Sequence, residues 1–287
     1  MQVRRISFFW AQGADHAPDL VKRCWDGWAA LNPGWEIAIG DTAQARSVFD
    51  ALRIAAPPVT LQGQADIFRV HDIAAHGGIY VDAATIPIRP LDDWLPALAG
   101  QGFFAFHDPY RKRSIENWFL YSDPGAVLTE RWLDQIRRYW SVTRRPQVAR
   151  RELDRGLKGD LACWMSSARM ALSGRDLKAK SVIEPRDRVW AVAPDGGGAR
   201  PVHPYFWPHY LFDHMLQTDP EARAAWSAVP KQPSYKSLML RHWKKSYAQM
   251  TERDVETLVA GSVMQKLALN TPPPQALLNK VFAMAGL

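Results

Sequence analysis

The sequence has few cysteines and no long apolar run. Its 287 residues contain two cysteines, Cys24 and Cys163, in no spacing used by metal sites or redox motifs, so we expect two free thiols in a reducing compartment. No stretch approaches the ~20 apolar residues that cross a bilayer. The opening residues predict a first strand rather than a signal peptide, so we expect a cytoplasmic protein.

The motifs of several common enzyme classes are also missing. The chain has no Gly-rich P-loop, no nucleophile elbow and no H-E-x-x-H helix. We therefore do not expect P-loop nucleotide hydrolysis, serine-hydrolase chemistry or zinc peptidase chemistry. A recognisable nucleic-acid-binding motif is missing too, so no nucleic-acid partner is expected.

Positive charge, by contrast, is in excess. The formal net charge is +7, and much of it lies in residues 137–155, with a smaller cluster at 241–245. A basic surface that carries aromatic residues predicts contact with an anionic glycan or with an anionic membrane. In the second case the protein would bind peripherally at the inner membrane face. The alternative is a solvated face without a partner.

Segments typical of strands and helices alternate through the first half of the chain. The predicted strands are 3–11, 35–41, 79–83, 102–108 and 117–123. The predicted helices are 17–34, 42–54 and 65–78, with a loop at 57–64. This alternation predicts an α/β fold with a mostly parallel sheet, in which ligands bind beyond the carboxyl ends of the strands. After Ser122 the pattern becomes mainly helical.

One segment, "ADIFRVHDIAAHGGIYVD" at 65–82, combines several polar features. Asp66 and Arg69 share a helix face, and Gly77-Gly78 turns the chain into a strand that ends at Asp82. Taken singly, these features predict a surface ion pair, a helix stop and a strand end. Together they place three polar side chains at one crevice, where a carboxylate and a guanidinium suit sugar hydroxyls. A diphosphate there would need a cation, often Mg²⁺ or Mn²⁺.

The segments "ADIFR", "HGGIYVD" and "IRPLDDW" resemble the sugar-binding region of glycosyltransferase family 32 and of the related capsular polysaccharide synthesis proteins. Those proteins read S-D-x-x-R, then Y-G-G-hydrophobic-aromatic-hydrophobic-D, then K/R-P-L-D. The likeness extends over residues 4–245. It implies an A-type glycosyltransferase fold and a single domain, 1–287. Within it, a Rossmann-like half, 1–125, would bind the nucleotide sugar, and a more helical half, 126–287, would bind the acceptor.

The resemblance also implies roles for individual residues. Asp66 and Arg69 would contact the donor sugar, and Asp82 would be the surviving acid of a D-x-D pair near the diphosphate. The other donor-binding residues it implies are Trp10, Gln12, Gly77, Gly78 and Trp118, and the catalytic residues are Asp82, Glu116 and Asn117. Trp10 could stack on a uracil. The alternative is that Trp10 is a tryptophan of the hydrophobic core.

The motif departs from family 32 at Ala84, where that family usually has its second aspartate and the capsular group commonly shows D-A-T. We expect a divalent cation, Mn²⁺ or Mg²⁺, held by Asp82 with waters or with a distant ligand. The candidate distant ligands are Asp108, His203, His209 and Asp213. Metal-free binding, with arginines neutralising the diphosphate, stays open.

The resemblance implies a glycosyltransferase that acts in capsular or surface polysaccharide synthesis. It would move a sugar from a nucleoside diphosphate donor, foremost a UDP-sugar, to a glycan or lipid-linked acceptor with retention of configuration. Catalysis would be electrostatic and positional, and the leaving phosphate oxygen would take the acceptor's proton. The alternative is a non-catalytic protein on the same fold that binds a sugar nucleotide or a glycan.

Overall fold

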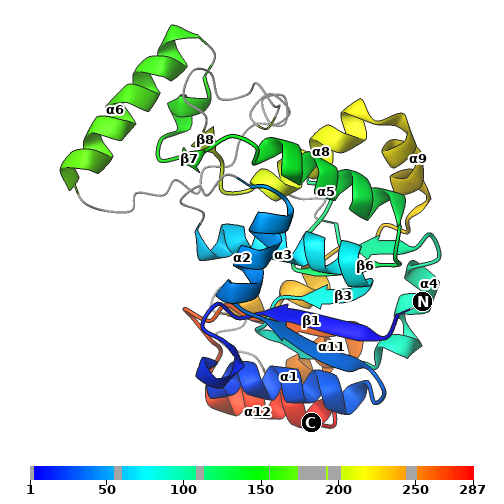
Figure 1. Cartoon of the computed structure of the whole chain (residues 1–287). Coiled ribbons are helices and arrows are strands. Elements are labelled where there is room, and N and C mark those ends of the chain that lie inside the picture. The colour runs from blue at the N-terminus through cyan, green and yellow to red at the C-terminus, as the bar shows by residue number, and fades with distance from the viewer. Residues whose placement is uncertain are drawn as a thin grey trace.

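A five-stranded sheet forms the centre of the protein in a computed structural model that describes residues 3–54, 60–107, 113–154, 156–173, 192, 202–243 and 251–287 (Figure 1). The strand order is β2-β1-β3-β6-β5. The strands are β1 (Arg5–Phe9), β2 (Glu36–Gly40), β3 (Gly78–Val81), β5 (Phe103–Ala105) and β6 (Phe119–Ser122). β1 is parallel to both β2 and β3, whereas β6 is antiparallel to β3 and β5.

The sheet is therefore mixed: the predicted common direction holds for β2, β1, β3 and β5, and β6 runs against them. The strands β1, β2 and β3 pair in parallel, because the helices between them return the chain to the same end of the sheet before each strand begins. β6 instead lies between β3 and β5 and runs against both. Parallel pairing of neighbouring strands thus ends after β3, although β5 runs in the same direction as β3.

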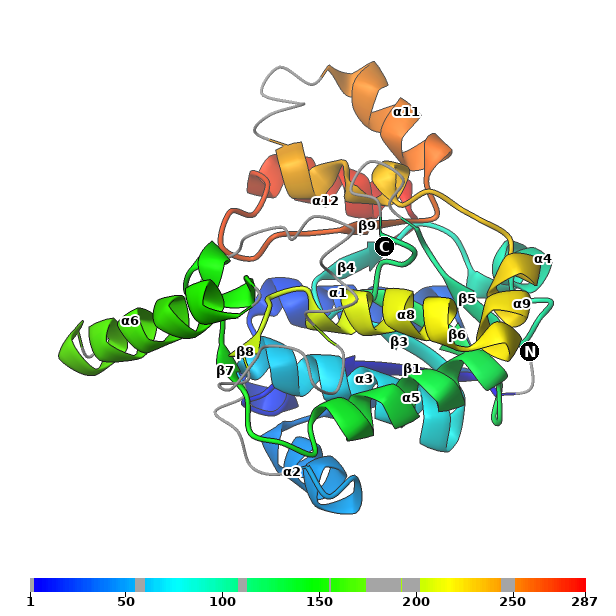
Figure 2. The same cartoon turned by 90° about the horizontal axis from the view of Figure 1, so that it is seen from above.

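Helices cover both faces of the sheet and give three layers (Figures 1 and 2). One core contains residues of α2 (Thr42–Ala51), α3 (Leu61–His76), α5 (Val127–Tyr139), α8 (Trp207–Thr218) and α9 (Pro220–Ala228). The other contains residues of α1 (Asp19–Leu31), α4 (Leu95–Leu98), α11 (Glu252–Gly261) and α12 (Gln275–Met284). Successive strand residues alternate between the cores: Tyr80 lies in the first, Ile79 and Val81 in the second.

Short elements complete the described chain. Two small two-stranded sheets are formed by β4 (Thr85–Pro87) with β9 (Met264–Lys266) and by β7 (Arg145–Pro146) with β8 (Val202–His203). The 3₁₀ helices are η1 (Ala14–His16), η2 (Leu91–Asp93), η3 (Arg150–Leu153), η4 (Tyr235–Leu238) and η5 (Leu240–His242). The longest described helix, α6 (Leu157–Ser173), projects away from the sheet (Figures 1 and 2). None of the described helices is long and apolar enough to span a membrane.

The helix α3 carries the polar motif toward the carboxyl ends of the strands. It begins at Leu61, because the Thr60 hydroxyl accepts a hydrogen bond from the amide of Gly63, 3.1 Å away. The predicted loop at 57–64 was therefore too long, because its residues from Leu61 on are helical. The helix ends at Gly77, whose φ of +68° suits glycine.

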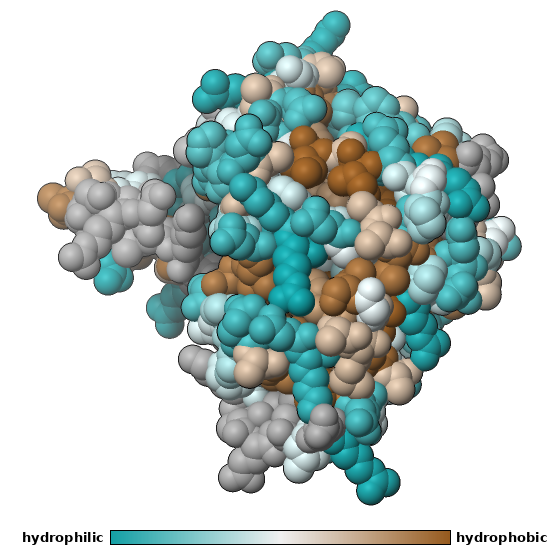
Figure 3. Space-filling model, turned by 90° about the horizontal axis from the view of Figure 1, so that it is seen from below, coloured by the Kyte–Doolittle hydropathy of each residue, from teal (hydrophilic) through white to brown (hydrophobic). Residues whose placement is uncertain are grey.

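The C-terminal helix α12 packs on α1 and closes the lower side of the molecule in Figure 1. Leu278, Val281 and Phe282 are buried there. The guanidinium of Arg23 on α1 lies 3.9 Å from the ring centroid of Phe282 and shields it from water. Figure 3, which views this side, shows apolar residues gathered among hydrophilic ones.

The basic stretch 137–155 is not one solvated face. Arg144 is buried, with its Nε donating to the carbonyl of Tyr139, and Arg145 pairs with buried Glu152 at 2.7 Å. Arg137 and Arg138 are exposed. The sequence overestimated the surface charge here, because it did not show which arginines fold inward to satisfy buried oxygens.

Candidate functional site

A cavity of about 640 Å³ opens at the carboxyl ends of β1 and β3. Its described walls come from α3, the segment 113–118, β8 and α8, and the C-terminal β9 with the residues that follow it. The volume is in the range of small-molecule and cofactor sites. Its position agrees with the expectation that ligands bind where these strands end.

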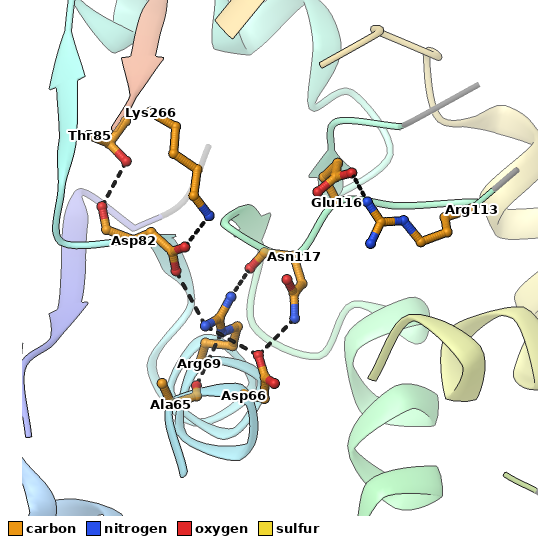
Figure 4. Close-up of polar contacts among 9 residues, drawn as sticks. All are labelled: Ala65, Asp66, Arg69, Asp82, Thr85, Arg113, Glu116, Asn117 and Lys266. Carbon is orange, nitrogen blue, oxygen red and sulfur yellow. Dashed lines mark hydrogen bonds and ion pairs between the residues drawn. The ribbon is translucent and has the colours of Figure 1, made fainter. Parts of the chain in front are cut away.

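Arg69 is the centre of the polar network on the floor of the cavity (Figure 4). Its guanidinium lies 3.2 Å from Asp66 Oδ1 and 3.3 Å from Asp82 Oδ1, and it donates to the carbonyl oxygen of Asn117 at 2.6 Å. It also stacks over the ring of Tyr80 at 4.7 Å. Only 7% of the Arg69 side chain is exposed, and its guanidinium bridges the two carboxylates.

Asp66 lies beside Arg69, one helical turn before it on α3. Its Oδ1 accepts a hydrogen bond from Asn117 Nδ2 at 2.9 Å, and only 14% of its side chain is exposed. Burial raises the pKa of Asp66 to about 6, although Arg69 opposes this shift. The carboxyl group therefore changes charge within the range of pH in which many enzymes work.

Asp82 follows β3 directly, and its amide donates to the carbonyl of Trp118 at 2.8 Å. Its Oδ1 faces Arg69, and its Oδ2 contacts the ammonium group of Lys266 (Figure 4). Burial alone would raise the pKa of this carboxyl, but Lys266 and Arg69 hold the pKa below its ordinary value. Asp82 is therefore an anion paired with two cations, and 26% of its side chain remains exposed.

Lys266 was missed by the sequence analysis. It ends β9, which pairs antiparallel with β4 so that Lys266 stands opposite Thr85, and Leu267 donates to the carbonyl of Ala84 at 2.8 Å. The short apolar segment around Lys266 could have suggested a strand. Nothing in it indicates the partner strand, so only the fold places this lysine at Asp82.

Tryptophans form two walls of the cavity. Trp10, which follows β1, is half-buried, and Trp118 is buried and stacked on Phe106 with ring centroids 5.2 Å apart. The indole Nε1 atoms of both are buried without a hydrogen-bond partner among the described residues. Two such donors beside a cavity fit a ligand that supplies acceptors. Gln12 also lines this part of the cavity and is exposed.

Glu116 and Asn117 enter the cavity from the segment before β6, but they do different things. Asn117 joins the network of Asp66, whereas Glu116 is buried in an ion pair with Arg113, apart from that network in Figure 4. The guanidinium of Arg113 also covers the ring of Phe206 at 4.6 Å. Glu116 thus belongs to a second polar group on the cavity wall.

Gly77 and Gly78 do not line the cavity, in contrast to their expected donor-binding role. They lie where β3 starts, at the end opposite to Asp82. A Cβ atom at Gly78 would lie 2.5 Å from the carbonyl oxygen of Arg5, and the φ of Gly78 is +86°. These glycines therefore let α3 turn into β3 beside β1, which is a structural role.

The described residues offer few ligands to a divalent metal ion beside Asp82. They contain no group of three His, Cys, Asp or Glu side chains that could hold one, and both oxygens of Asp82 face cations. His203 and His209 line the cavity but pack on aromatic rings, Trp140 at 5.1 Å and Phe206 at 5.6 Å. Burial lowers the pKa of His203 to about 4.

The two other candidate ligands are Asp213 and Asp108. The carboxylate of Asp213 accepts a hydrogen bond from the amide of Ser114 at 3.2 Å and does not line the cavity. Asp108 lies outside the described residues. The expectation of a divalent cation held by Asp82 with waters or with a distant ligand stays a prediction.

The fold and site define a mixed α/β protein with a polar, cationic cavity at the ends of its parallel strands. A family model described as "Capsular polysaccharide synthesis protein" matches residues 1–147, just over half of the 287 residues. The chain belongs to this family. The matched region includes α3, β3 and the segment 113–118, and hence Asp66, Arg69 and Asp82.

Two solved structures show weak similarity. PaToxG glycosyltransferase is 10% identical, with a TM-score of 0.38 over 99% of this chain and 85% of that one. The catalytic domain of the alpha-toxin from Clostridium novyi is 8% identical, with a TM-score of 0.34 over 48% of this chain and 58% of that one, so the match spans little more than half of the toxin domain. Similarity at these scores carries no argument about function. Comparison with curated proteins gave no match.

Proposed function

We propose that this protein is a glycosyltransferase of capsular or surface polysaccharide synthesis. It moves a sugar from a nucleoside diphosphate donor, foremost a UDP-sugar, to a glycan or lipid-linked acceptor. The observation that carries this proposal is the network of Asp66, Arg69, Asp82 and Asn117 at the strand ends. Membership of the capsular polysaccharide synthesis family supports the same substrate class.

The donor would lie along the cavity in three parts. Trp10 and Gln12, which line the cavity next to the end of β1, would contact the base and the ribose. Asp66 and Asn117 supply an acceptor and a donor for sugar hydroxyls, held in place by Arg69. Lys266 and Arg241 lie on the same cavity, where they would attract the phosphates.

In the proposed reaction, the oxygen of the acceptor hydroxyl bonds to the anomeric carbon of the sugar. The bond from that carbon to the phosphate oxygen breaks, and the leaving phosphate oxygen takes the acceptor's proton. The reaction is proposed to retain the configuration of the anomeric carbon. The protein's part is to orient the two substrates and to stabilise negative charge on the leaving group.

A purified sample can test the proposal directly. Nucleotide sugars with uracil, guanine, cytosine and thymine bases should be screened for thermal stabilisation, followed by slow hydrolysis of the donor that stabilises best. Stabilisation together with release of the nucleoside diphosphate supports the transferase. Binding without release favours the alternative, a non-catalytic sugar-nucleotide-binding protein, and no binding contradicts both.

A membrane-associated acceptor is the second part of the proposal, and α6 supports it. Its exposed apolar side chains are Leu157, Leu161, Trp164, Met165 and Leu172. At 3.6 residues per turn they occupy one arc of about 100°. The exposed cations Lys158 and Arg169 border this arc. An apolar stripe bordered by cations suits the surface of an anionic bilayer.

A further inference from the structure

We infer that Lys266, together with Arg241, holds the diphosphate of the donor and takes the place of a divalent cation. The inference rests on the proposed function, because it names the groups that meet the donor's phosphates. Three features of the described structure carry it: the engaged oxygens of Asp82, the buried position of Lys266, and the charge of the cavity.

The carboxylate of Asp82 already has the partners that a metal ion would need to displace. Arg69 faces Oδ1 at 3.3 Å, and Lys266 contacts Oδ2. A divalent ion bound there would lie next to two cations and would be repelled by both. Mg²⁺ and Mn²⁺ also prefer several oxygen ligands, whereas the other carboxylate of this network, Asp66, is itself engaged by Arg69 and Asn117.

Lys266 is built into the site rather than placed on its rim. Only 12% of its side chain is exposed, and Nζ lies 5.6 Å from the ring centroid of Trp118. Backbone pairing of β9 with β4 fixes its position. An ammonium group has three N–H donors, so the contact with Asp82 leaves donors that can bind phosphate oxygens.

The cavity has more cations than carboxylates among its described lining residues. Four cations, Arg69, Arg113, Arg241 and Lys266, stand against three carboxylates, Asp66, Asp82 and Glu116. Lys266 and Arg241 carry like charges on the wall of the same cavity and therefore repel each other. A diphosphate bound between them would relieve this repulsion without a bridging metal ion.

The affinity for UDP tests the inference without relying on turnover. Isothermal titration of UDP into the wild type should give the same Kd, within about 2-fold, in EDTA and in Mn²⁺. Lys266→Met should weaken UDP at least ~10-fold in both buffers, and Arg241→Met should act in the same direction. Lys266→Arg should keep most of the affinity. Lys236→Met is the matched control, because Lys236 is exposed and does not line the cavity.

The outcomes separate the inference from the proposed function. If UDP or another nucleoside diphosphate binds only with Mn²⁺, the inference is overturned and the proposed function stands. If UDP, GDP, CDP and dTDP all fail to bind, both are overturned. Should Lys266→Met fail to fold, the wild-type titrations still decide, and electron paramagnetic resonance of added Mn²⁺ adds a second measurement. Bound Mn²⁺ at micromolar protein contradicts the inference, and free Mn²⁺ supports it.

Discussion

The ammonium group of Lys266 contacts the carboxylate of Asp82 although 184 residues separate them in the chain. The contact exists because the chain returns from its C-terminal part to pair β9 with β4, directly after Asp82. Asp82 is thereby held between Lys266 and Arg69, which stand on different elements. The polar floor of the cavity is thus assembled from the family-matched region and from a strand far beyond it.

Replacing Asp82 should test whether this contact serves the reaction. Asp82→Asn keeps the size of the side chain and one acceptor oxygen but removes the charge that fixes Lys266 and Arg69. We expect donor hydrolysis and transfer to fall at least ~10²-fold, which corresponds to roughly 2.7 kcal/mol of transition-state stabilisation. Steady-state rates and a thermal melt measure the effect and the fold.

The matched control for that change is Asp92→Asn. Asp92 pairs with Arg4 at 3.0 Å on the surface, where 46% of its side chain is exposed. It should leave the rates unchanged, since exposed pairs contribute little. Near-normal turnover of Asp82→Asn would remove Asp82 from the site.

Asp66 should distinguish a donor sugar from a bare nucleotide. Asp66→Ala removes an acceptor for sugar hydroxyls, so it should weaken UDP-sugar binding ~10-fold or more but UDP by no more than about 2-fold. Titrations with the two ligands give the ratio. Asp134→Ala is the control, because Asp134 forms the same i,i+3 pair with Arg137 on an exposed helix face. Equal weakening of both ligands by Asp66→Ala would mean that the pair is only structural.

The raised pKa of Asp66 predicts a pH dependence of donor binding. With a pKa of about 6, the carboxyl loses its charge as the pH falls below 6, and a protonated Asp66 accepts hydrogen bonds less well. We expect UDP-sugar affinity to fall up to ~10-fold between pH 7 and pH 5. UDP affinity measured in parallel controls for protonation of the nucleotide. In Asp66→Asn the ratio of the two affinities should not change with pH.

The same shift has a consequence for stability. Because the folded-state pKa of Asp66 lies above the ordinary value near 3.9, its contribution is fully favourable below that pH and is lost as the pH rises through about 6. Denaturant unfolding of the wild type and Asp66→Asn should therefore show the wild type gaining stability relative to the variant as the pH falls from 7 to 4. Parallel curves would contradict a raised pKa.

The sequence predicted the local part of this site and missed the long-range part. Asp66, Arg69 and Asp82 lie within 17 residues, and helix periodicity and a strand end suffice to bring them together. Lys266 depends on strand pairing between distant segments, which local patterns do not specify. For the same reason the sequence could not show that Arg144 is buried. The mixed sheet was missed because the direction of β6 follows from its place between two strands, not from its own residues.

The proposed contact of α6 with membranes can be measured with vesicles. Replacing Leu161, Trp164 and Met165 with Gln should reduce binding to vesicles of anionic lipid at least several-fold and leave donor hydrolysis in solution unchanged. Tyr235→Gln with Met284→Gln removes exposed side chains elsewhere and should have no effect on binding. Binding of the wild type should weaken with salt, because Lys158 and Arg169 contribute through charge. A wild type that ignores anionic vesicles at low salt contradicts the proposal.

Ala84 gives the last test, because it stands where a second aspartate would make a metal site. The strand β3 ends at Val81 and the chain bends at Ala83 and Ala84, yet Ala84 lines the cavity next to β9. An acid there would lie near Lys266 and would compete with the diphosphate for its N–H donors. We therefore expect Ala84→Asp to weaken UDP at least ~10-fold in EDTA, without recovery in Mn²⁺. Ala84→Asn, which has nearly the same size without the charge, separates repulsion from crowding and should weaken UDP much less. Recovery of Ala84→Asp by Mn²⁺ would show instead that the cavity can become a metal site with one added carboxylate, in which case Lys266 does not prevent a cation from binding beside Asp82.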